Sequence, residues 1–483
     1  MTAVAAVALG AWIASMLPAM LGAPWHITMA IWAVFLIVAL AATARDRALF
    51  LPLTYVALVA FPVVDYLLPP RHGFIGGAPG NLAYYPADLL LLAAAALAAI
   101  HGQPILPRGP LKGFLLLGGA YLVGLLPGAL VSTHPLESWM QWLATVRAIL
   151  AATVVAGLSL RGAGQAIPVL LGVVIVQAGL AAAQQIRQGA LGLMLLGEAG
   201  DDQLFKYIAQ GVGLWRSGGT IGHPNSFASY VVGLLPVCVI TAVAGRPAAF
   251  RILGLVSAVA SVASLVWSYS RAAWAVALIS LAVLAALAMR AFSRRRAISR
   301  RVIAMSVVAG VVVVLSLPAV RHRLQRTETS AADVRVALVS VARSMLRAYP
   351  ISGVGLSQFA VRVPEFDPVL ALELFRHPVH SIVMLDAAEA GYPGGFASVA
   401  MWGGGAVLAF CHAYACARRR RLQAAGMWVG CVALVLHNAL DWTLRQPAIL
   451  LLFWVLVALA SSEEIAEREP VYPQGGAPED GRL

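Results

Sequence analysis

Arginine, histidine and glycine gather in three short segments of this chain. Residues 216–225 read RSGGTIGHPN, residues 268–271 read SYSR, and His380 stands directly before another apolar run. A guanidinium can hold a phosphate through two parallel hydrogen bonds, as Arg216 could here. A neutral imidazole near pH 7 can accept a proton from an attacking hydroxyl. These residue types are therefore suited to binding an anion and to removing a proton.

Each segment also has a purely structural interpretation. Gly218, Gly219 and Gly222 would let the backbone approach a ligand closely, and amides near a helix start favour anions. A glycine-rich break with an arginine at headgroup level is common in membrane proteins, so both interpretations of Arg216 stay open. A lone histidine at the start of a span is more often a hydrogen-bonded interface residue, so the role of His380 stays open as well.

Two arginines and one carboxylate lie beside or inside apolar runs. An arginine deep in a bilayer costs about 2.5–3.5 kcal/mol on insertion scales. Arg271 has no loop to shelter it and Arg147 lies inside a predicted span, so each must reach the interface or line a polar cavity. Glu389 lies well inside the helix that follows His380, and we expect it to pair with an arginine.

The composition indicates that lipid surrounds most of the chain. Of the 483 residues, 60% are hydrophobic and 11% are charged, against about 25% charged in a soluble globular protein. The net charge of +13 would suggest nucleic acid, but the basic residues separate apolar runs instead of covering one face. The four cysteines lack metal-ligand spacing and Asp201-Asp202 has no second ligand cluster, so we predict no metal and no cofactor.

Apolar runs of about 17–22 residues recur along the chain, and each could cross a bilayer core of roughly 30 Å. We predict an all-α, polytopic helical membrane protein with about 12–14 transmembrane helices, since a helix satisfies every backbone group within its own segment. The first run lacks a basic segment before it, so we interpret it as a retained helix. The predicted spans are 3–21, 25–43, 48–66, 86–101, 113–132, 139–158, 164–186, 225–244, 252–269, 272–291, 302–320, 381–411, 424–440 and 447–461.

Charge divides the connections between these spans into two sets. Arginine and lysine concentrate in alternate loops, including the Arg418–Arg421 run, which predicts that those loops and both termini are cytoplasmic. The opposite loops carry arginines too, Arg376 among them, and these indicate an anionic partner on the outer side. The predicted regions are 1–320 with the first eleven spans, 321–380 as a large outer loop, 381–461 with the last spans, and 462–483 as a disordered cytoplasmic tail.

One stretch of the predicted outer loop is amphipathic. In residues 333–347, Val334, Leu338, Val341 and Met345 recur at helical spacing, while the arginines at 335, 343 and 347 fall on another arc. Such a helix would lie at the membrane surface. It could serve only to pack on the bundle, or its arginines could face a phosphate-bearing lipid.

Taken together and in this order, these segments resemble the O-antigen ligase superfamily, which includes lipopolysaccharide O-antigen ligases, polysaccharide polymerases and some oligosaccharyltransferases. The ligase pattern His-(Asn/Ser/Gln)-x9-Gly-x-x-Gly is met by His380, Ser381, Gly391 and Gly394. The two upstream arginine segments are similar to the family's arginine sites, and the stretch through YPISGVGLSQF at 349–359 is similar to its large outer loop. The likeness extends over most of the chain.

The resemblance implies a membrane glycosyltransferase that acts on a glycan carried by polyprenyl (undecaprenyl) diphosphate. Arg216 and Arg271 would hold the diphosphate, and His380 would be the base toward an acceptor sugar hydroxyl on a lipid A core. This metal-independent transfer would take place at the periplasmic face of the bacterial inner (cytoplasmic) membrane, as part of lipopolysaccharide biosynthesis in the cell envelope. Further substrate-binding residues would be His223, Asn225, Glu389, Arg376 and Arg147.

Other functions remain open on the sequence alone. An O-antigen or exopolysaccharide polymerase would use the same residues with a second lipid-linked glycan as acceptor. A flippase or transporter for the lipid-linked sugar would also need arginines and many helices, but it predicts charges along a path through the bundle and, often, internal repeats. A structural membrane protein would need no histidine and arginines on one face. The predicted partners are therefore the lipid-linked donor, one of these acceptors and membrane lipids, without nucleic acid.

Overall fold

The computed structural model describes residues 55–61, 65–66, 83–84, 109–158, 163–193, 196–208, 212–245, 247–292, 329–367 and 377–466. The predicted spans 3–21, 25–43, 86–101 and 302–320 lie outside these residues, as do most of 48–66 and most of the predicted tail. The count of 12–14 helices therefore stays a prediction.

Six long helices form the first half of the described bundle, and each coincides with a predicted span. Their lengths of 20 to 25 residues suit a bilayer crossing. They are α5 (Leu111–Leu130), α6 (Pro135–Leu158), α7 (Ala163–Arg187), α9 (Pro224–Ala244), α10 (Ala248–Ser268) and α11 (Arg271–Phe292).

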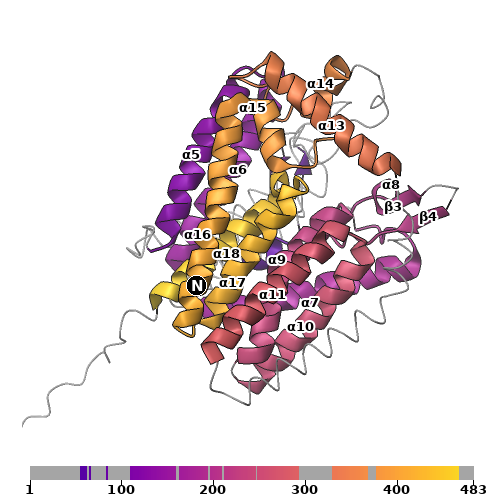
Figure 1. Ribbon diagram of the computed structural model, residues 1–483. Helices are drawn as coiled ribbons and strands as arrows, with labels where there is room; N and C mark the ends of the chain where they lie inside the picture. The colour runs from indigo at the N-terminus through magenta and orange to yellow at the C-terminus, as the bar shows by residue number, and fades with distance from the viewer. Residues whose placement is uncertain are drawn as a thin grey trace, which may run out of the picture.

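The C-terminal helices complete the described bundle (Figure 1). They are α15 (Ile382–Ser398), a π-helical stretch (Val399–Gly404), α16 (Gly405–Arg418), α17 (Leu422–Ala439), a 3₁₀ turn (Thr443–Arg445) and α18 (Pro447–Ala466). Among the described residues, eight helical runs are long and apolar enough to cross a membrane, and the run Ile382–Arg418 is the longest of them. The protein is thus an all-α, multi-pass membrane protein, as predicted.

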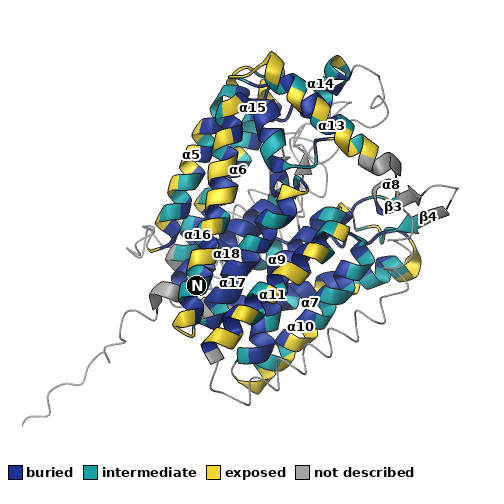
Figure 2. Cartoon of the chain, in the orientation of Figure 1, coloured by how far each residue is buried: buried dark blue, intermediate teal, exposed yellow. Residues whose placement is uncertain are grey.

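The centre of the bundle is formed by α9, α17 and α18, which Figure 2 shows as almost continuously buried. Small residues let α9 and α17 approach closely. A Cβ added at Gly430 would lie 2.2 Å from the Gly233 carbonyl oxygen, so the two backbones cross at these glycines. This close crossing fixes the position of the first turn of α9 relative to the end of α17.

Helix α15 is broken within its second half. Gly391 has φ of 72°, a conformation that favours glycine, and Pro393 follows it inside the helix. The loop 350–356 inserts at this break and supplies hydrogen-bond partners. The Val354 N–H donates to the Ala388 carbonyl (2.9 Å), the Gly355 N–H donates to the Glu389 carbonyl (3.0 Å), and the Tyr392 N–H donates to the Pro350 carbonyl (2.7 Å). The break is therefore satisfied by protein, as a bilayer requires.

Two helices of the predicted outer loop lie across one end of the bundle (Figure 1). The first, α13 (Thr329–Ala348), includes the predicted amphipathic stretch, and α14 (Phe359–Phe366) follows it. Leu338, Val341 and Met345 of α13 are buried in a second apolar cluster with Phe359, Val379 and Leu385. The three arginines of α13 are exposed. This arrangement confirms the predicted amphipathic helix and its packing on the bundle.

Four short strands and one short helix of the described residues were not predicted. Strands β1 (Asp65–Tyr66) and β2 (Ala83–Tyr84) form one antiparallel pair. Helix α8 (Asp201–Leu204) leads into the second pair, β3 (Phe205–Ile208) and β4 (Val212–Trp215). The β3–β4 hairpin ends directly before Arg216, so it leads the chain into the glycine-rich segment.

Candidate active site

Arg216 lies between two helix ends and is held by neutral oxygens. Its side chain is only 8% exposed. The Nε–H donates to the Ser268 carbonyl oxygen (2.8 Å), and Nη2 donates to Oδ1 of Asn225 (2.6 Å). The Ser217 N–H also donates to the Trp267 carbonyl (3.0 Å). The structure thus brings the RSGGTIGHPN and SYSR segments together, and neither of these two partners of Arg216 carries a charge.

The glycine-rich loop is fixed by glutamines of α7, which corrects one expectation. The N–H groups of Gly218 and Gly219 both donate to Oε1 of Gln184 (3.0 Å each), and the Thr220 N–H donates to Oε1 of Gln177 (3.0 Å). These amides were expected to favour a ligand anion, but they are occupied by protein. Glycine is needed at 218 because an added Cβ would lie 1.9 Å from the Gly222 carbonyl oxygen. The loop serves as a rigid support for Arg216.

Asp441 connects the arginine segment to the predicted base. It lies in the turn between α17 and α18 and is buried. Its Oδ2 accepts a hydrogen bond from Nδ2 of Asn225 (2.8 Å), and its Oδ1 lies 3.4 Å from Nδ1 of His380. Arg216, Asn225, Asp441 and His380 therefore form one continuous chain of side-chain hydrogen bonds, drawn from three separate parts of the sequence.

This chain of contacts fixes the tautomer of His380. An ionised carboxylate only accepts hydrogen bonds, so Nδ1 of His380 must donate to Asp441. The other ring nitrogen, Nε2, then carries the lone pair that can accept a proton. His380 is 26% exposed, so its ring lies at the surface of the described structure while its partner is buried.

The surroundings of Asp441 keep it ionised. Burial acts to raise the pKa of its carboxyl, but the hydrogen bond from His380, the nearby charges of His380 and His437, and the Trp442 N–H together hold this pKa below its ordinary value. The Trp442 N–H lies 2.8 Å from Oδ1 of Asp441. Asp441 is therefore a fixed negative charge behind the imidazole of His380.

The remaining predicted site residues differ in position. Arg271 is the exposed first residue of α11, directly after the Tyr269 turn that follows α10. His223 is the N-cap of α9, where its Nδ1 accepts the Asn225 N–H (3.2 Å). Both lie in segments that contact Arg216. Arg376 lies outside the described residues.

Arg147 lies in the middle of α6, away from the buried polar side chains of that helix. Glu137, Gln141 and Thr145 are buried at intervals of four residues and form a stripe along α6. Arg147 follows Thr145 by two residues, which turns it about 200° round the helix from this stripe. It therefore faces a different side of α6 from this stripe, and also from Ser138, whose hydroxyl donates to the Leu356 carbonyl.

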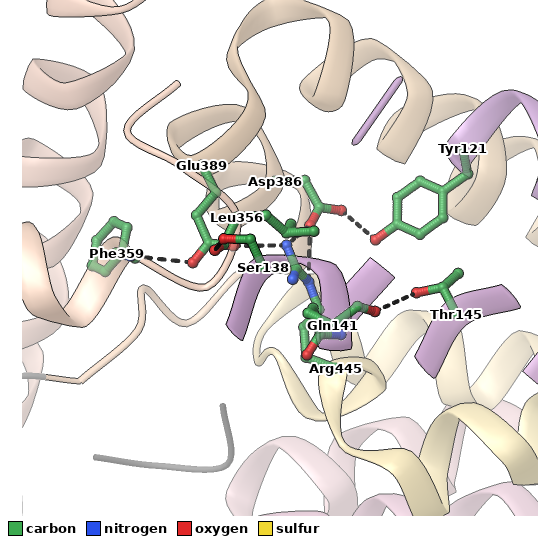
Figure 3. Close-up of polar contacts among 9 residues, drawn as sticks. All are labelled: Tyr121, Ser138, Gln141, Thr145, Leu356, Phe359, Asp386, Glu389 and Arg445. Carbon is green, nitrogen blue, oxygen red and sulfur yellow. Dashed lines mark hydrogen bonds and ion pairs between the residues drawn. The ribbon is translucent and has the colours of Figure 1, made fainter. Parts of the chain in front are cut away.

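Glu389 belongs to a separate buried ion cluster (Figure 3). Its Oε2 lies 2.9 Å from Nη2 of Arg445, which confirms that it pairs with an arginine. Arg445 also binds Asp386 through Nε (3.0 Å) and Nη2, and the Tyr121 hydroxyl donates to Oδ2 of Asp386 (2.8 Å). Oε1 of Glu389 accepts the Phe359 N–H (3.2 Å). Glu389 is thus occupied by protein groups from two other segments.

Sequence reasoning missed Asp441 and Asp386. Asp441 stands in the short linker between the last two spans, where a single carboxylate beside His437 and Arg445 was a signal that could have been used. Asp386 lies six residues after His380 inside an apolar run, and a carboxylate at membrane depth is expensive unless paired. Neither belongs to the motif that indicated the site.

The fold and these contacts define a multi-pass helical membrane protein with a polar site where several helices begin or end. Residues 256–399 match the family model described as O-antigen ligase, a segment that includes Arg271 and His380. This match supports the resemblance to the O-antigen ligase superfamily, and it indicates a glycosyltransferase-like activity of the ligase or polymerase type. No curated protein matches the chain.

Proposed function

We propose that this protein transfers a glycan from a polyprenyl (undecaprenyl) diphosphate donor to a sugar hydroxyl of a lipid A core. The reaction takes place at the periplasmic face of the bacterial inner membrane and needs no metal. The support comes from the hydrogen-bonded chain Arg216–Asn225–Asp441–His380, which joins a fixed cation to an oriented base.

His380 is the base in this proposal. The acceptor hydroxyl attacks the anomeric carbon of the donor sugar, and its proton moves to Nε2 of His380. The new bond joins the acceptor oxygen to the anomeric carbon, while the bond from that carbon to the diphosphate oxygen breaks. The electron pair leaves with the polyprenyl diphosphate. A single displacement of this kind inverts the anomeric configuration.

Arg216 and Arg271 stabilise the leaving group. Negative charge grows on the diphosphate as its bond to the sugar breaks, and guanidinium groups held in place before the reaction need little reorganisation to stabilise it. A diphosphate leaves readily without protonation, which agrees with a site built from one histidine and arginines instead of a pair of carboxylates of the glycosidase kind. Asp441 stabilises the imidazolium that forms when His380 takes the proton.

A transfer assay in lipid nanodiscs tests the proposal. Purified protein receives a polyprenyl-diphosphate-linked glycan together with either lipid A core or a second lipid-linked glycan, in EDTA. We expect glycan on the lipid A core, and a loss of roughly 10²–10⁴-fold in kcat for His380→Gln. His412→Gln is the matched control, because His412 stacks on Trp428 in the apolar core at a centroid distance of 5.2 Å.

The molecule that receives the glycan distinguishes the ligase from the polymerase and the flippase. Lengthened lipid-linked glycan that also depends on His380 would make the protein a polymerase with the same base. Movement of the lipid-linked glycan across the bilayer without covalent transfer to either acceptor would replace the enzyme by a flippase. Transfer that survives His380→Gln unchanged would show that another group is the base.

A further inference from the structure

Arg445 is the centre of a fully buried polar cluster that the transfer chemistry does not use directly. It contacts two carboxylates of α15, Asp386 and Glu389, and its own side chain is only 7% exposed. Tyr121 of α5 donates to Asp386, and the Phe359 N–H of α14 donates to Glu389. One side chain thus gathers α5, α14, α15 and the turn before α18, as Figure 3 shows.

The two residues of the candidate dyad, His380 and Asp441, are each only a few residues along the chain from a member of this cluster. Asp441 precedes Arg445 by four residues, and the Arg445 N–H donates to the Trp442 carbonyl (2.9 Å). His380 precedes Asp386 by six residues and lies two residues before the start of α15, the helix that contains Asp386. The bond between Arg445 and Asp386 therefore sets the distance between the two segments that carry Asp441 and His380.

Glu389 extends this connection to the break in α15. Its carbonyl accepts the Gly355 N–H and its carboxylate accepts the Phe359 N–H, so it holds both ends of the segment 355–359. Arg445 fixes the carboxylate of Glu389 from the other side. Because the α15 backbone is broken two residues later at Gly391, the half that carries His380 depends on side-chain contacts for its orientation.

We propose that Arg445 is a positioning residue for glycan transfer, acting through Asp441 on His380. This inference rests on the proposed function, because it takes the His380–Asp441 pair as the reacting dyad. The two-pronged contact with Asp386 and Glu389 holds the 441–445 turn against α15, which keeps Oδ1 of Asp441 at Nδ1 of His380. Arg445 itself touches neither donor nor acceptor.

Arg445→Lys tests the inference because lysine keeps the charge but cannot reach both carboxylates with a planar fork. We expect kcat to fall roughly 10- to 100-fold, as a small displacement of a catalytic group does, while the KM for the donor stays within about twofold. Asp441→Asn should lower kcat as well, and the double variant should lower it little further, because both changes remove the same contact.

Two further variants separate positioning from folding. Tyr121→Phe removes only the hydrogen bond to Asp386 and keeps the ring packed on Trp402, so it should fold normally and lower kcat by a smaller factor in the same direction. Arg290→Lys is the control arginine, since Arg290 lies over the Tyr414 ring (5.3 Å) at the opposite end of α11 from Arg271. It should leave kcat unchanged.

A spectroscopic measurement tests this inference without depending on glycan transfer. In ¹⁵N-histidine-labelled protein in lipid bilayers, the Nδ1 proton of His380 should be shifted by its hydrogen bond to Asp441, with His380→Gln providing the assignment. Loss of this shift in Arg445→Lys supports positioning even if no transfer is found. The inference would be overturned if Arg445→Lys left the His380 Nδ1 proton shift unchanged and its effect on kcat added to that of Asp441→Asn. Arg445 would then be a structural residue only.

Discussion

At the scale of single residues, the site depends on a carboxylate that the family motif does not include. Asp441 receives hydrogen bonds from Asn225 and Trp442 and faces Nδ1 of His380. These partners fix both oxygens, so the carboxylate cannot turn away from the imidazole without losing another contact. Ser-His-Asp hydrolases use a similar pair, in which a buried carboxylate orients the histidine that removes a proton from a hydroxyl.

Asp441→Asn should therefore reduce transfer without preventing donor binding. An amide cannot stabilise the imidazolium as a carboxylate does, so we expect kcat to fall at least about tenfold, but less than the roughly 10²–10⁴-fold expected for loss of the base. Donor affinity, measured by titration of the lipid-linked glycan, should stay the same. A variant with full kcat would remove Asp441 from the mechanism.

The lowered pKa of Asp441 also predicts how its contribution to stability depends on pH. Its ordinary pKa is about 3.9, and the folded protein holds it lower, so ionised Asp441 stabilises the fold above about pH 4. This contribution decreases as the pH falls below about 4 through the lowered pKa. Thermal melting of the wild type and Asp441→Asn should give a larger Tm difference at pH 5 than at pH 3. A difference that grows in acid would contradict this assignment.

At the scale of elements, the broken helix α15 explains the spacing of the ligase pattern. His380 lies two residues before the helix, and Gly391 breaks it. Gly394 lets the following turn pack against the Asp386 carbonyl oxygen, which would lie 2.7 Å from an added Cβ. The loop 350–356 fills the break with its own backbone groups. The glycine-containing loop 350–356 and the Gly391–Gly394 stretch are about forty residues apart in the sequence, and they contact each other at the break in α15.

Gly391→Ala should destabilise the protein. Its φ of 72° is strained for alanine, and the added Cβ would lie 2.5 Å from the Ile351 carbonyl carbon and oxygen. We expect a cost of at least about 1–3 kcal/mol, seen as a lower Tm in detergent and loss of transfer. Gly403→Ala is the matched control in the following π-helical stretch, where the nearest atom to a Cβ is 3.9 Å away. Equal melting of the two variants would show that the break tolerates a side chain.

At the scale of the whole molecule, the two ends of the bundle differ in chemistry. The starts of α6, α9, α11 and α15 and the turn before α18 meet around Arg216, Asp441 and Arg445. The opposite end carries Arg290 and the Arg418–Arg421 run. This concentration of arginine at one end of the described bundle agrees with a cytoplasmic face, and it predicts that the His380 end faces the periplasm.

Cysteine labelling checks this orientation. In a variant whose four native cysteines are replaced by serine or alanine, Ser352→Cys at the His380 end should react with a membrane-impermeant maleimide in intact spheroplasts. Arg420→Cys at the other end should react only after permeabilisation. The reverse pattern would place the site in the cytoplasm and exclude a donor that has been flipped to the outer leaflet.

The amino-acid sequence by itself determined the class of this protein. Long apolar runs must become helices in a bilayer, so the predicted spans that lie wholly within the described residues were found as helices, as was the amphipathic α13, whereas the predicted span 48–66 ends in strand β1 (Asp65–Tyr66). The expected pairing of Glu389 with an arginine was confirmed, because a carboxylate at that depth needs a partner. These features depend on local composition and the cost of burying charge.

Only the tertiary structure decided which residues meet. Asp441 faces His380, and Arg445 rather than another arginine binds Glu389. Gln184 occupies the amides of Gly218 and Gly219. Each of these contacts joins segments that are far apart in the chain. The close crossing of α9 and α17 at Gly233 and Gly430 is another contact of this kind. Spacing along a sequence specifies what one helix presents on its faces, whereas the packing of backbones at ångström separations decides which faces come together.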